Sequence, residues 1–321
     1  MSRYLNFIKK IIGGSEKLSS TYGISKYWFY WDYAICFIKY GCLIDQYTKG
    51  HFFMMNKVTR RRSITQRKLE YLMKKYNDYN YIHLLKNKNE FNAFFKDYIE
   101  RDWLYTKNMD KDAFLEFCNS NEQLFLKPLD EQEGHGINIL KTNSADLMTV
   151  YEDLKCKNIL VESIIRQNHL MTLGNKSVNS ARILTVIDKS KKAHILRAGL
   201  RAGVGDSIVD NYSAGGVLYE IDIKTGIIDH KGIQGDNYDI IYHPGTDKCM
   251  LGFQIPNWNK AIETVIKAAE KIPQCRFIGW DVAFTDKGVE LIEGNHNPGL
   301  FTLESLGTPG AYADIMAILN S

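Results

Sequence analysis

The most informative stretch of this chain reads GWDVAF at residues 279–284, TDKG at 285–288 and VELIEGNHNPG at 289–299. The outer segments are short and apolar and the middle one is a turn, which predicts a β-hairpin. Successive side chains of a strand point to opposite faces, so Glu293 and Asn295 share a face, and the hairpin brings Asp281 beside them. Carboxylate and amide oxygens suit Mg²⁺ that is shared with nucleotide phosphates. A hairpin with a polar edge is the alternative, but an unpaired carboxylate among apolar neighbours is costly, which favours the metal site.

A second motif lies nearer the N-terminus, where FLKP at residues 125–128 precedes DEQEGHGI at 130–137. A lysine at the end of a strand, followed by a glycine-bearing loop, can present an ammonium group and backbone N–H groups to phosphates. This interpretation assigns the phosphate contacts to Lys127, Gly134 and Gly136. A hairpin with an exposed lysine is the alternative, and the three acidic residues of the loop fit a phosphate poorly.

A third motif, ILVESII at residues 159–165, is an apolar strand that carries one glutamate, Glu162. By itself this pattern favours an edge strand whose glutamate points into solvent.

The rest of the chain divides into a helical and a mixed part. All six prolines lie at or beyond Pro128, and residues 91–99 repeat apolar side chains at helical spacing, so the N-terminal third is predicted to be mainly helical. A further helix is predicted at residues 259–272, before Pro273. Strands are predicted at residues 124–127, 138–140, 159–162, 181–187, 193–200, 216–223, 277–283 and 289–293.

Length and composition limit the class of protein. A chain of 321 residues with 45% apolar and 24% charged residues is typical of a soluble globular protein of two domains or one large multilobed unit. The net charge of +4 is too small to indicate nucleic acid. Residues 1–80, however, hold 15 basic and 5 acidic side chains, so the surface of this part differs in charge from that of the rest of the chain.

Cysteine usage and hydropathy favour a cytoplasmic protein. The six cysteines form no CxxC pair and the chain begins with no signal peptide, so reduced thiols in the cytosol are expected. The most apolar segment, residues 28–44, contains Asp32 and Lys39, whereas a bilayer span needs about 20 predominantly apolar residues. No transmembrane helix is predicted.

The chain has no GxxxxGK[ST], GxGxxG, HExxH or GxSxG motif, which makes several common enzyme classes poor candidates. The order of the three motifs above is nevertheless specific. A lysine strand, a glycine loop, a strand that ends in Glu-x-x-aliphatic and then Asp…Glu-x-Asn-x-x-Pro-Gly resembles the ATP-grasp superfamily over residues 85–310. SVNSARI at residues 177–183 and IGWDV at 278–282 are similar to the narrower sugar-transfer-associated ATP-grasp family.

This resemblance implies an α+β ATP-grasp fold, in which two α+β subdomains clasp ATP, with a basic and mainly helical N-terminal region added. The implied divisions are a helical basic region at residues 1–110, a lid subdomain at 111–170 and a C-terminal metal and substrate subdomain at 171–321.

The resemblance also implies roles for individual residues. Lys127 and Lys88 would bind the phosphates of ATP. Ser163 and Ile165 would bond to adenine through their backbone, with Glu162 beside it. His169 would occupy the ribose position, where the family usually has a carboxylate. The same comparison assigns Mg²⁺ to the three residues of the C-terminal hairpin, Asp281, Glu293 and Asn295.

One position departs from the family pattern. Many members have an arginine two residues before the first metal carboxylate, where this chain has Gly279. Another cation must therefore stabilise the transferring phosphoryl group, because electrostatic stabilisation usually makes the largest single contribution to catalysis. Arg182 and Arg197 are expected to be catalytic, and Arg201 is equally well explained as a surface residue. Residues 210–216 are either a substrate-covering loop or a flexible connection.

Basic and aromatic side chains are concentrated near the N-terminus. Residues 57–68 contain six basic residues and no acidic one, and residues 27–40 contain eight aromatic ones. The combination suggests contact with an anionic membrane surface or a polyprenyl-phosphate-linked glycan. A solvated helix over an aromatic core is the alternative, and nucleic acid is not expected.

Together these patterns predict an ATP- and Mg²⁺-dependent carboxylate–amine ligase that acts through an acyl phosphate in cell-surface polysaccharide biosynthesis. Its partners would be a small carboxylate and an amine, one of them a sugar or a lipid-linked glycan. The protein would be cytoplasmic, or peripheral at the inner face of the membrane. Two alternatives stay open: a phosphotransferase that acts on a sugar or glycan hydroxyl, and a non-catalytic nucleotide-binding assembly protein.

Overall fold

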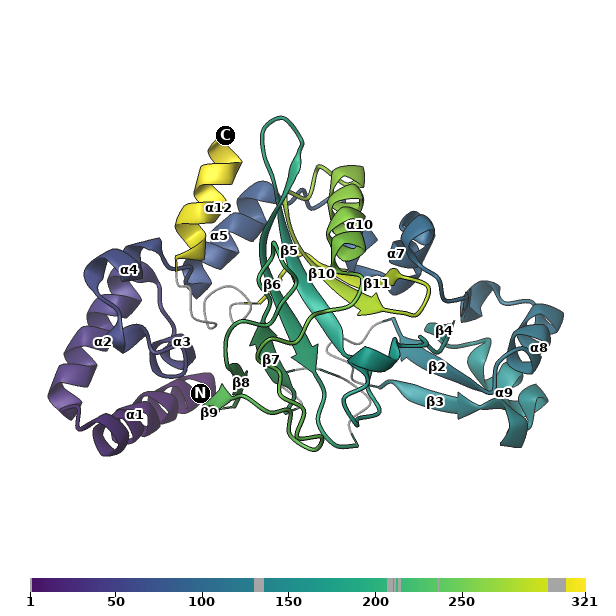
Figure 1. The fold of residues 1–321 in the computed structure, drawn as a ribbon, viewed down its shortest axis with the longest axis horizontal. Coiled ribbons are helices and arrows are strands. Elements are labelled where there is room, and N and C mark those ends of the chain that lie inside the picture. The colour runs from purple at the N-terminus through teal and green to yellow at the C-terminus, as the bar shows by residue number, and fades with distance from the viewer. Residues whose placement is uncertain are drawn as a thin grey trace.

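Two β-sheets and a group of N-terminal helices build the chain (Figure 1). The computed structural model describes residues 2–129, 136–206, 210, 212, 215–235, 237–299 and 310–321. The helical group lies at one end of the molecule, the smaller sheet lies at the other end, and the larger sheet lies between them (Figure 1).

The larger sheet has seven strands in the order β11-β10-β5-β6-β7-β8-β9. All neighbouring strands are antiparallel. The hairpin predicted around residues 285–288 is present, and the strands predicted at residues 181–187 and 193–200 form a second hairpin. The strands are β5 (Ser180–Ile187), β6 (Ala193–Ala202), β7 (Val217–Glu220), β8 (Gly232–Gln234), β9 (Asn237–Ile240), β10 (Phe277–Phe284) and β11 (Val289–Asn295).

The smaller sheet has four antiparallel strands in the order β1-β4-β2-β3. They are β1 (Trp103–Tyr105), β2 (Gln123–Pro128), β3 (Asn138–Lys141) and β4 (Ile159–Ser163). Helices α8 (Lys111–Asn119) and α9 (Leu147–Leu154) cover one face of this sheet. Because β4 lies between β1 and β2, the interpretation of the Glu162 strand as an edge strand is wrong. The sheet also begins at Trp103, within the range expected to be helical.

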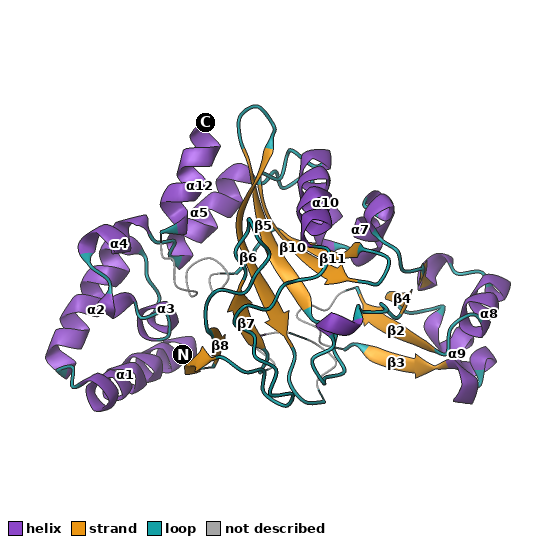
Figure 2. Cartoon of the chain, in the orientation of Figure 1, coloured by secondary structure: helices purple, strands orange, loops and turns teal. Residues whose placement is uncertain are grey.

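Apolar side chains build two cores on opposite faces of the larger sheet. Helix α10 (Trp258–Lys271), predicted at residues 259–272, covers one face and packs against Ile183 and Trp280. Helices α5 (Gln66–Tyr76) and α12 (Ala311–Asn320) cover Leu184 and Val186 on the other face. Figure 2 shows these helices on both sides of the strands. Beyond α5 and α12, the alternation of side chains places Arg182, Arg201 and Asp281 on this second face.

The N-terminal third is helical, as predicted. Its helices are α1 (Ser2–Tyr22), α2 (Lys26–Tyr40), α3 (Ile44–Thr48), α4 (Lys57–Arg62), α5, α6 (His83–Lys86) and α7 (Lys88–Phe94). The first four enclose an aromatic core that includes Phe29, Tyr33, Tyr47 and Phe52. Among the described residues, no helix combines the length and the apolar character that a membrane span requires.

Basic residues of segment 57–68 hold this helical region together. Arg60 is buried and donates from Nη1 to Asp32 Oδ1 at 2.7 Å and from Nη2 to Asp32 Oδ2 at 2.8 Å. Arg67 donates to the last carbonyls of α2, and Lys68 donates to the carbonyls of Arg61 and Ser63. The interpretation of this segment as a solvated helix is therefore incomplete, because four of its six basic side chains have internal partners, the fourth being Arg62, whose Nη2 lies 3.8 Å from Asp314 Oδ1.

Replacing Arg60 by Gln should lower the thermal stability of the protein. The change removes the charge that neutralises Asp32, and breaking one partner of a buried ion pair costs about 3–5 kcal/mol. Thermal unfolding followed by circular dichroism should give a lower midpoint for Arg60→Gln. Arg61→Gln is the matched control, because the Arg61 side chain is exposed. Equal midpoints for the two variants would show that the Arg60–Asp32 pair does not stabilise the fold.

Candidate active site

The β10–β11 hairpin gathers the three residues that the sequence assigned to a metal ion. Asp281 lies directly opposite Glu293, and two residues along, Gly279 lies opposite Asn295. Asn295 Nδ2 donates to Glu293 Oε1 at 3.0 Å. On the other side of β10, Arg182 of β5 lies opposite Asp281. Two carboxylates, one amide and one guanidinium group thus meet at the same end of the sheet.

Asp281 is a buried carboxylate held between two arginines. Arg182 donates from Nε to Oδ1 and from Nη2 to Oδ2, the latter at 2.8 Å. Arg201 donates from Nη1 to Oδ2 at 2.6 Å. Burial alone would raise the pKa of Asp281, but the two guanidinium groups outweigh it and hold the pKa well below its usual range. Asp281 is therefore ionised.

A second buried carboxylate, Asp210, lies on the far side of Arg201. Its Oδ1 accepts Arg201 Nη2 at 2.9 Å, and its Oδ2 accepts the backbone N–H and the hydroxyl of Ser180. Burial raises the pKa of Asp210 despite the charge of Arg201. Sequence reasoning named residues 210–216 as a loop or connection but gave Asp210 no role. In the structure Asp210 orients the Arg201 guanidinium towards Asp281.

The hairpin residues suit a hard cation that has further ligands. Within the part of the chain that the structure describes, no group of three or more His, Cys, Asp and Glu side chains could hold a metal ion. Partial burial and the charge of Asp281 raise the pKa of Glu293, so a cation here would relieve the repulsion between the two carboxylates. Mg²⁺ commonly uses one or two carboxylates, with water and phosphate oxygens completing its shell. The donor set therefore fits Mg²⁺ shared with a phosphate.

Arg182 occupies the space beside Gly279, where the family pattern has an arginine. A Cβ atom at Gly279 would lie 3.0 Å from Arg182 Cδ and 2.8 Å from Pro298 Cβ. Arg182 Nη1 also donates to the Pro298 carbonyl at 3.1 Å. Because glycine has no side chain, position 279 leaves space for the Arg182 side chain to reach Asp281. The neighbouring strand supplies a guanidinium group at the place where β10 itself has none.

A second cluster lies in the smaller sheet, where Glu162 has three partners. Lys127 of β2 pairs with its carboxylate, Arg101 Nε lies 3.1 Å from its Oε1, and Asn92 Nδ2 donates to Oε1 at 2.8 Å. Burial alone would raise the pKa of Glu162, but Arg101 and Lys127 lower it to about 2. Glu162 is thus buried and ionised, and not solvent-facing as the isolated motif suggested. It fixes the ammonium group of Lys127 at the end of β2.

Arg101 connects the two sheets. It donates from Nη1 to Glu290 Oε2 at 3.1 Å and to the Leu291 carbonyl at 2.7 Å, and from Nη2 to the Ile292 carbonyl at 3.2 Å. These acceptors lie on β11 immediately before Glu293. Arg101 also contacts Glu162, which pairs with Lys127. Its guanidinium group therefore sets the position of β2, which carries Lys127, relative to β11.

Sequence reasoning missed Arg101, Asn92 and Glu290. Arg101 lies 189 residues from Glu290, and Asn92 lies 70 residues from Glu162, so no local pattern links them. Only Glu290 carried a signal, since it is a carboxylate between two apolar residues of a predicted strand. The reasoning that singled out Glu293 applies to it equally.

The two expected phosphate-binding lysines approach the same place. Lys88, at the start of α7, donates from Nζ to the Pro128 carbonyl at 2.9 Å, next to Lys127 at the end of β2. Gly134 lies outside the described residues. Gly136 has a φ of 70°, in the left-handed region that favours glycine.

The residues expected near adenosine follow β4. The backbone N–H of Ser163 donates to the Asp102 carbonyl at 3.0 Å and is therefore not available to adenine. Ile165 is partly buried and His169 is exposed. The backbone of the intervening segment joins the larger sheet, where the Asn168 N–H donates to the Phe284 carbonyl at 2.8 Å.

Arg197 is not part of the Asp281 cluster. It lies on the same face of β6 as Arg201, because the two residues are four apart in one strand. Its Nη2, however, donates to Asp314 of α12 at 3.1 Å. The structure therefore separates the expected arginines, since Arg182 and Arg201 contact Asp281 whereas Arg197 helps to attach α12.

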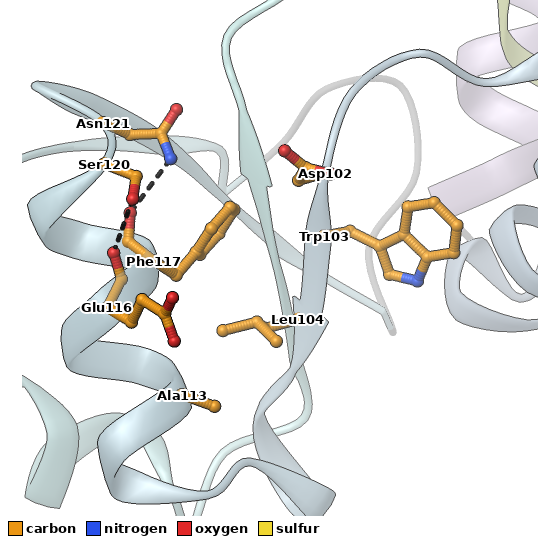
Figure 3. A pocket seen from close by; sticks show the side chains of 8 residues that line it. All are labelled: Asp102, Trp103, Leu104, Ala113, Glu116, Phe117, Ser120 and Asn121. Carbon is orange, nitrogen blue, oxygen red and sulfur yellow. Dashed lines mark hydrogen bonds between the residues drawn. The ribbon is translucent and has the colours of Figure 1, made fainter.

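The cavity shown in Figure 3 lies between β1 and α8, on the helix-covered side of the smaller sheet. Leu104 and Phe117 point into it, and Ser120 and Asn121 donate to carbonyls of α8 at 2.9 Å. None of the residues that the sequence assigned to a site lines this cavity. Glu162 points to the opposite face of the sheet, because Val161 packs with the helices.

The fold and the two clusters were compared with known proteins. A family model described as sugar-transfer associated ATP-grasp matches residues 66–316. No curated protein matches the chain.

Several solved structures are similar to this chain. The ATP-grasp ligase PsnB, complexed with precursor peptide PsnA2 and AMPPNP, aligns at a TM-score of 0.47 and 14% identity over 76% of this chain and 61% of PsnB. N5-carboxyaminoimidazole synthetase from Staphylococcus aureus aligns at 0.48 and 12% identity over 81% and 59% of the two chains. D-alanine-D-alanine ligase from Coxiella burnetii aligns at 0.43 and 10% identity over 73% and 57%. The chain spans about three fifths of the length of each of these structures.

The family match covers more than three quarters of the chain and includes both clusters. It also agrees with the order of motifs along the sequence. The chain therefore belongs to the sugar-transfer associated ATP-grasp family and has the ATP-grasp fold, with a helical region at its N-terminus.

Proposed function

We propose that this protein is an ATP- and Mg²⁺-dependent carboxylate–amine ligase. The observation that carries the proposal is the pair of arginines, Arg182 and Arg201, bound to Asp281 beside the hairpin residues that suit Mg²⁺. Family membership makes ATP the expected nucleotide. The arginines supply fixed positive charge of the kind that an acyl phosphate requires.

The proposed reaction has two steps. A carboxylate oxygen of the substrate attacks the γ-phosphorus of ATP, the bond to the leaving ADP oxygen breaks, and an acyl phosphate forms. The nitrogen of an amine then attacks the acyl carbon, phosphate leaves and the nitrogen loses a proton, which yields an amide. Negative charge develops first on the phosphoryl oxygens and then on the acyl oxygen. Preorganised cations in an enclosed site stabilise such charge strongly, and Arg182 and Arg201 are our candidates for this role.

Lys127, at the end of β2, and Lys88, at the start of α7, would bind phosphate oxygens. Lys127 is positioned by Glu162, and Lys88 lies next to it. The backbone around Gly134 and Gly136 would add N–H donors, and Ile165, Glu162 and His169 would lie near the adenosine. Glu293, Asn295 and Asp281 would hold Mg²⁺, which neutralises the charge of phosphate oxygens when bound.

Replacing Lys127 by Met should weaken ATP binding or turnover by roughly ten- to a hundredfold, the cost of losing one charge-assisted hydrogen bond. The fold should survive, because Glu162 keeps Arg101 and Asn92 as partners. ATP titration by calorimetry and steady-state kinetics measure the effect. Lys141→Met is the matched control, since Lys141 is an exposed lysine of the same sheet. ATP binding and turnover that are unchanged in Lys127→Met would leave Lys127 with a structural role only, as a partner of Glu162.

The substrates we propose are a small carboxylate and an amine, one of them carried on a sugar or a lipid-linked glycan. The description of the family as sugar-transfer associated supports this choice. The reaction would belong to the biosynthesis or modification of cell-surface polysaccharide. A lipid-linked substrate would bring the cytoplasmic protein to the inner face of the membrane.

An ADP-release screen tests the proposal. Amino acids would be paired with uronic-acid and amino-sugar acceptors in the presence of ATP and Mg²⁺, and the products weighed by mass spectrometry. A product that equals the sum of two reactants minus water supports a ligase. A product that gains phosphate would instead show a phosphotransferase, because the same nucleotide site serves a hydroxyl acceptor. ATP binding with no ADP release from any pair would favour a non-catalytic assembly protein.

A further inference from the structure

Helix α2 has no polar face. Phe29, Tyr33, Cys36 and Tyr40 point into the aromatic core and are at most 7% exposed. The opposite side of the helix carries Tyr27, Trp28, Trp31, Ile35 and Ile38, which are 40% to 87% exposed. A helix that is apolar all round is normally buried on all sides, so the outer side of α2 requires a partner.

Helix α1 extends this apolar surface. Leu5, Ile8 and Ile12 recur at three- and four-residue spacing and are 46% to 54% exposed. The two helices lie side by side, because the Phe7 ring contacts the Phe37 ring at 6.4 Å and Ser15 Oγ lies 3.1 Å from Tyr30 Oη. We name the surface formed by Leu5, Ile8, Ile12, Tyr27, Trp28, Trp31, Ile35 and Ile38 the aromatic face. Figure 1 shows both helices at the end of the molecule remote from the smaller sheet.

The charge around the aromatic face is positive. The first 50 residues contain seven basic and three acidic side chains. Each of the three acidic groups already has a basic partner: Glu16 pairs with Lys26 at 3.7 Å, Asp32 with Arg60 at 2.7 Å, and Asp45 with Lys10 at 2.6 Å. The excess charge of the two helices therefore comes from lysines such as Lys9, on α1, and Lys39, in the last turn of α2.

We propose that the aromatic face docks the protein onto an anionic membrane surface. Tryptophan and tyrosine favour the membrane–water interface, where an apolar ring and a polar tip both find suitable surroundings. Helices that lie in this interface combine an apolar side with lysines that attract anionic headgroups. A second copy of this chain fits the surface less well, because it would bring two positively charged helix pairs together. The proposal does not depend on which reaction the protein catalyses.

The proposed membrane contact lies on α1 and α2 and not on the basic run at residues 57–68. The sequence pointed to the basic run at residues 57–68, but Arg60, Arg67 and Lys68 of that run hold helices together. The aromatic residues of segment 27–40 divide in the structure into a buried set and an exposed set. It is the exposed set, with the lysines of α1 and α2, that forms the surface.

Sedimentation of the full chain with vesicles tests the proposal. The probes are vesicles of phosphatidylglycerol and phosphatidylcholine in equal parts, and vesicles of phosphatidylcholine alone. The wild type should sediment with the anionic vesicles at low salt, and binding should weaken as salt is added because surface charge is screened. The double variant Trp31→Ser, Ile38→Ser should partition at least tenfold more weakly. The double variant Lys9→Gln, Lys39→Gln should lose roughly thirtyfold at low salt.

Matched controls separate this proposal from its competitors. Tyr79 and Tyr242 are equally exposed aromatic residues outside the helix pair, and changing both to Ser should leave vesicle binding unchanged. Circular dichroism would verify that every variant is folded. Failure of the wild type to sediment with anionic vesicles at low salt overturns the proposal. So does light scattering that shows a wild-type dimer which Trp31→Ser, Ile38→Ser converts to a monomer.

Discussion

Glu293→Gln should abolish ATP-dependent turnover while leaving the protein folded. Gln has nearly the same volume and its amide oxygen can still accept the hydrogen bond from Asn295, so the local packing is kept. What is lost is the negative charge that a divalent cation requires beside Asp281. We expect kcat to fall at least about a hundredfold, the scale found when one electrostatic contact to the transition state is removed. Turnover and thermal unfolding measured together, at several Mg²⁺ concentrations, test this expectation.

The matched control for Glu293 is Glu263→Gln, an exposed glutamate on α10, which should retain wild-type kcat and thermal midpoint. If Glu293→Gln keeps wild-type kcat at limiting Mg²⁺, the metal assignment is wrong. A large drop in the thermal midpoint would mean instead that Glu293 supports the fold.

The three residues that the sequence predicts to be metal ligands lie within one hairpin. Asp281, Glu293 and Asn295 fall within 15 consecutive residues, so strand alternation and a turn suffice to bring them together. The β5–β6 hairpin is local in the same sense. Pairing between neighbouring segments can be read from a sequence, because a short turn fixes which strand lies next to which.

The remaining contacts of the site could not be read in this way. Arg182 lies 99 residues before Asp281, and Arg101 lies 189 residues before Glu290. Each contact depends on the strand order β11-β10-β5-β6 or on the approach of the two sheets, which no local pattern specifies. The same limit explains why the sequence favoured Arg197 over Arg201 as a catalytic residue. Only the placement of α12 separates Arg197, which contacts Asp314, from the other two.

The role of the basic residues of segment 57–68 could not be predicted from the local sequence either. A run of basic residues without acidic ones indicates an external partner when only composition is considered. Arg60 instead neutralises Asp32, which lies 28 residues earlier in an aromatic segment that looked membrane-like. Asp32, the acidic residue within the apolar segment, and Arg60, one of the basic run, form one buried ion pair. Neither could be interpreted without the other.

Arg182→Lys should reduce kcat by about a hundredfold or more while leaving ATP binding nearly intact. Lysine keeps the positive charge, but it cannot donate to both oxygens of Asp281 and to the Pro298 carbonyl in the planar arrangement of a guanidinium group. Asp281 stays ionised because Arg201 still contacts it. If Arg182 stabilises the phosphoryl and acyl oxygens, a misplaced cation should cost about 2.7–4 kcal/mol of transition-state stabilisation. Steady-state kinetics and ATP titration separate this effect on kcat from an effect on binding.

Arg197→Lys is the matched control for the Arg182 prediction. Arg197 lies on the same face of the sheet, but its partner is Asp314, which Arg62 also approaches at 3.8 Å. The change should alter the free energy of unfolding by about 1 kcal/mol or less, as for a partly exposed ion pair, and leave turnover unchanged. Equal losses of kcat in the two variants would mean that the whole arginine row acts together, and that contact with Asp281 does not select the catalytic arginine. A loss confined to Arg182→Lys would show that the guanidinium beside Gly279 does the work of the arginine that β10 lacks.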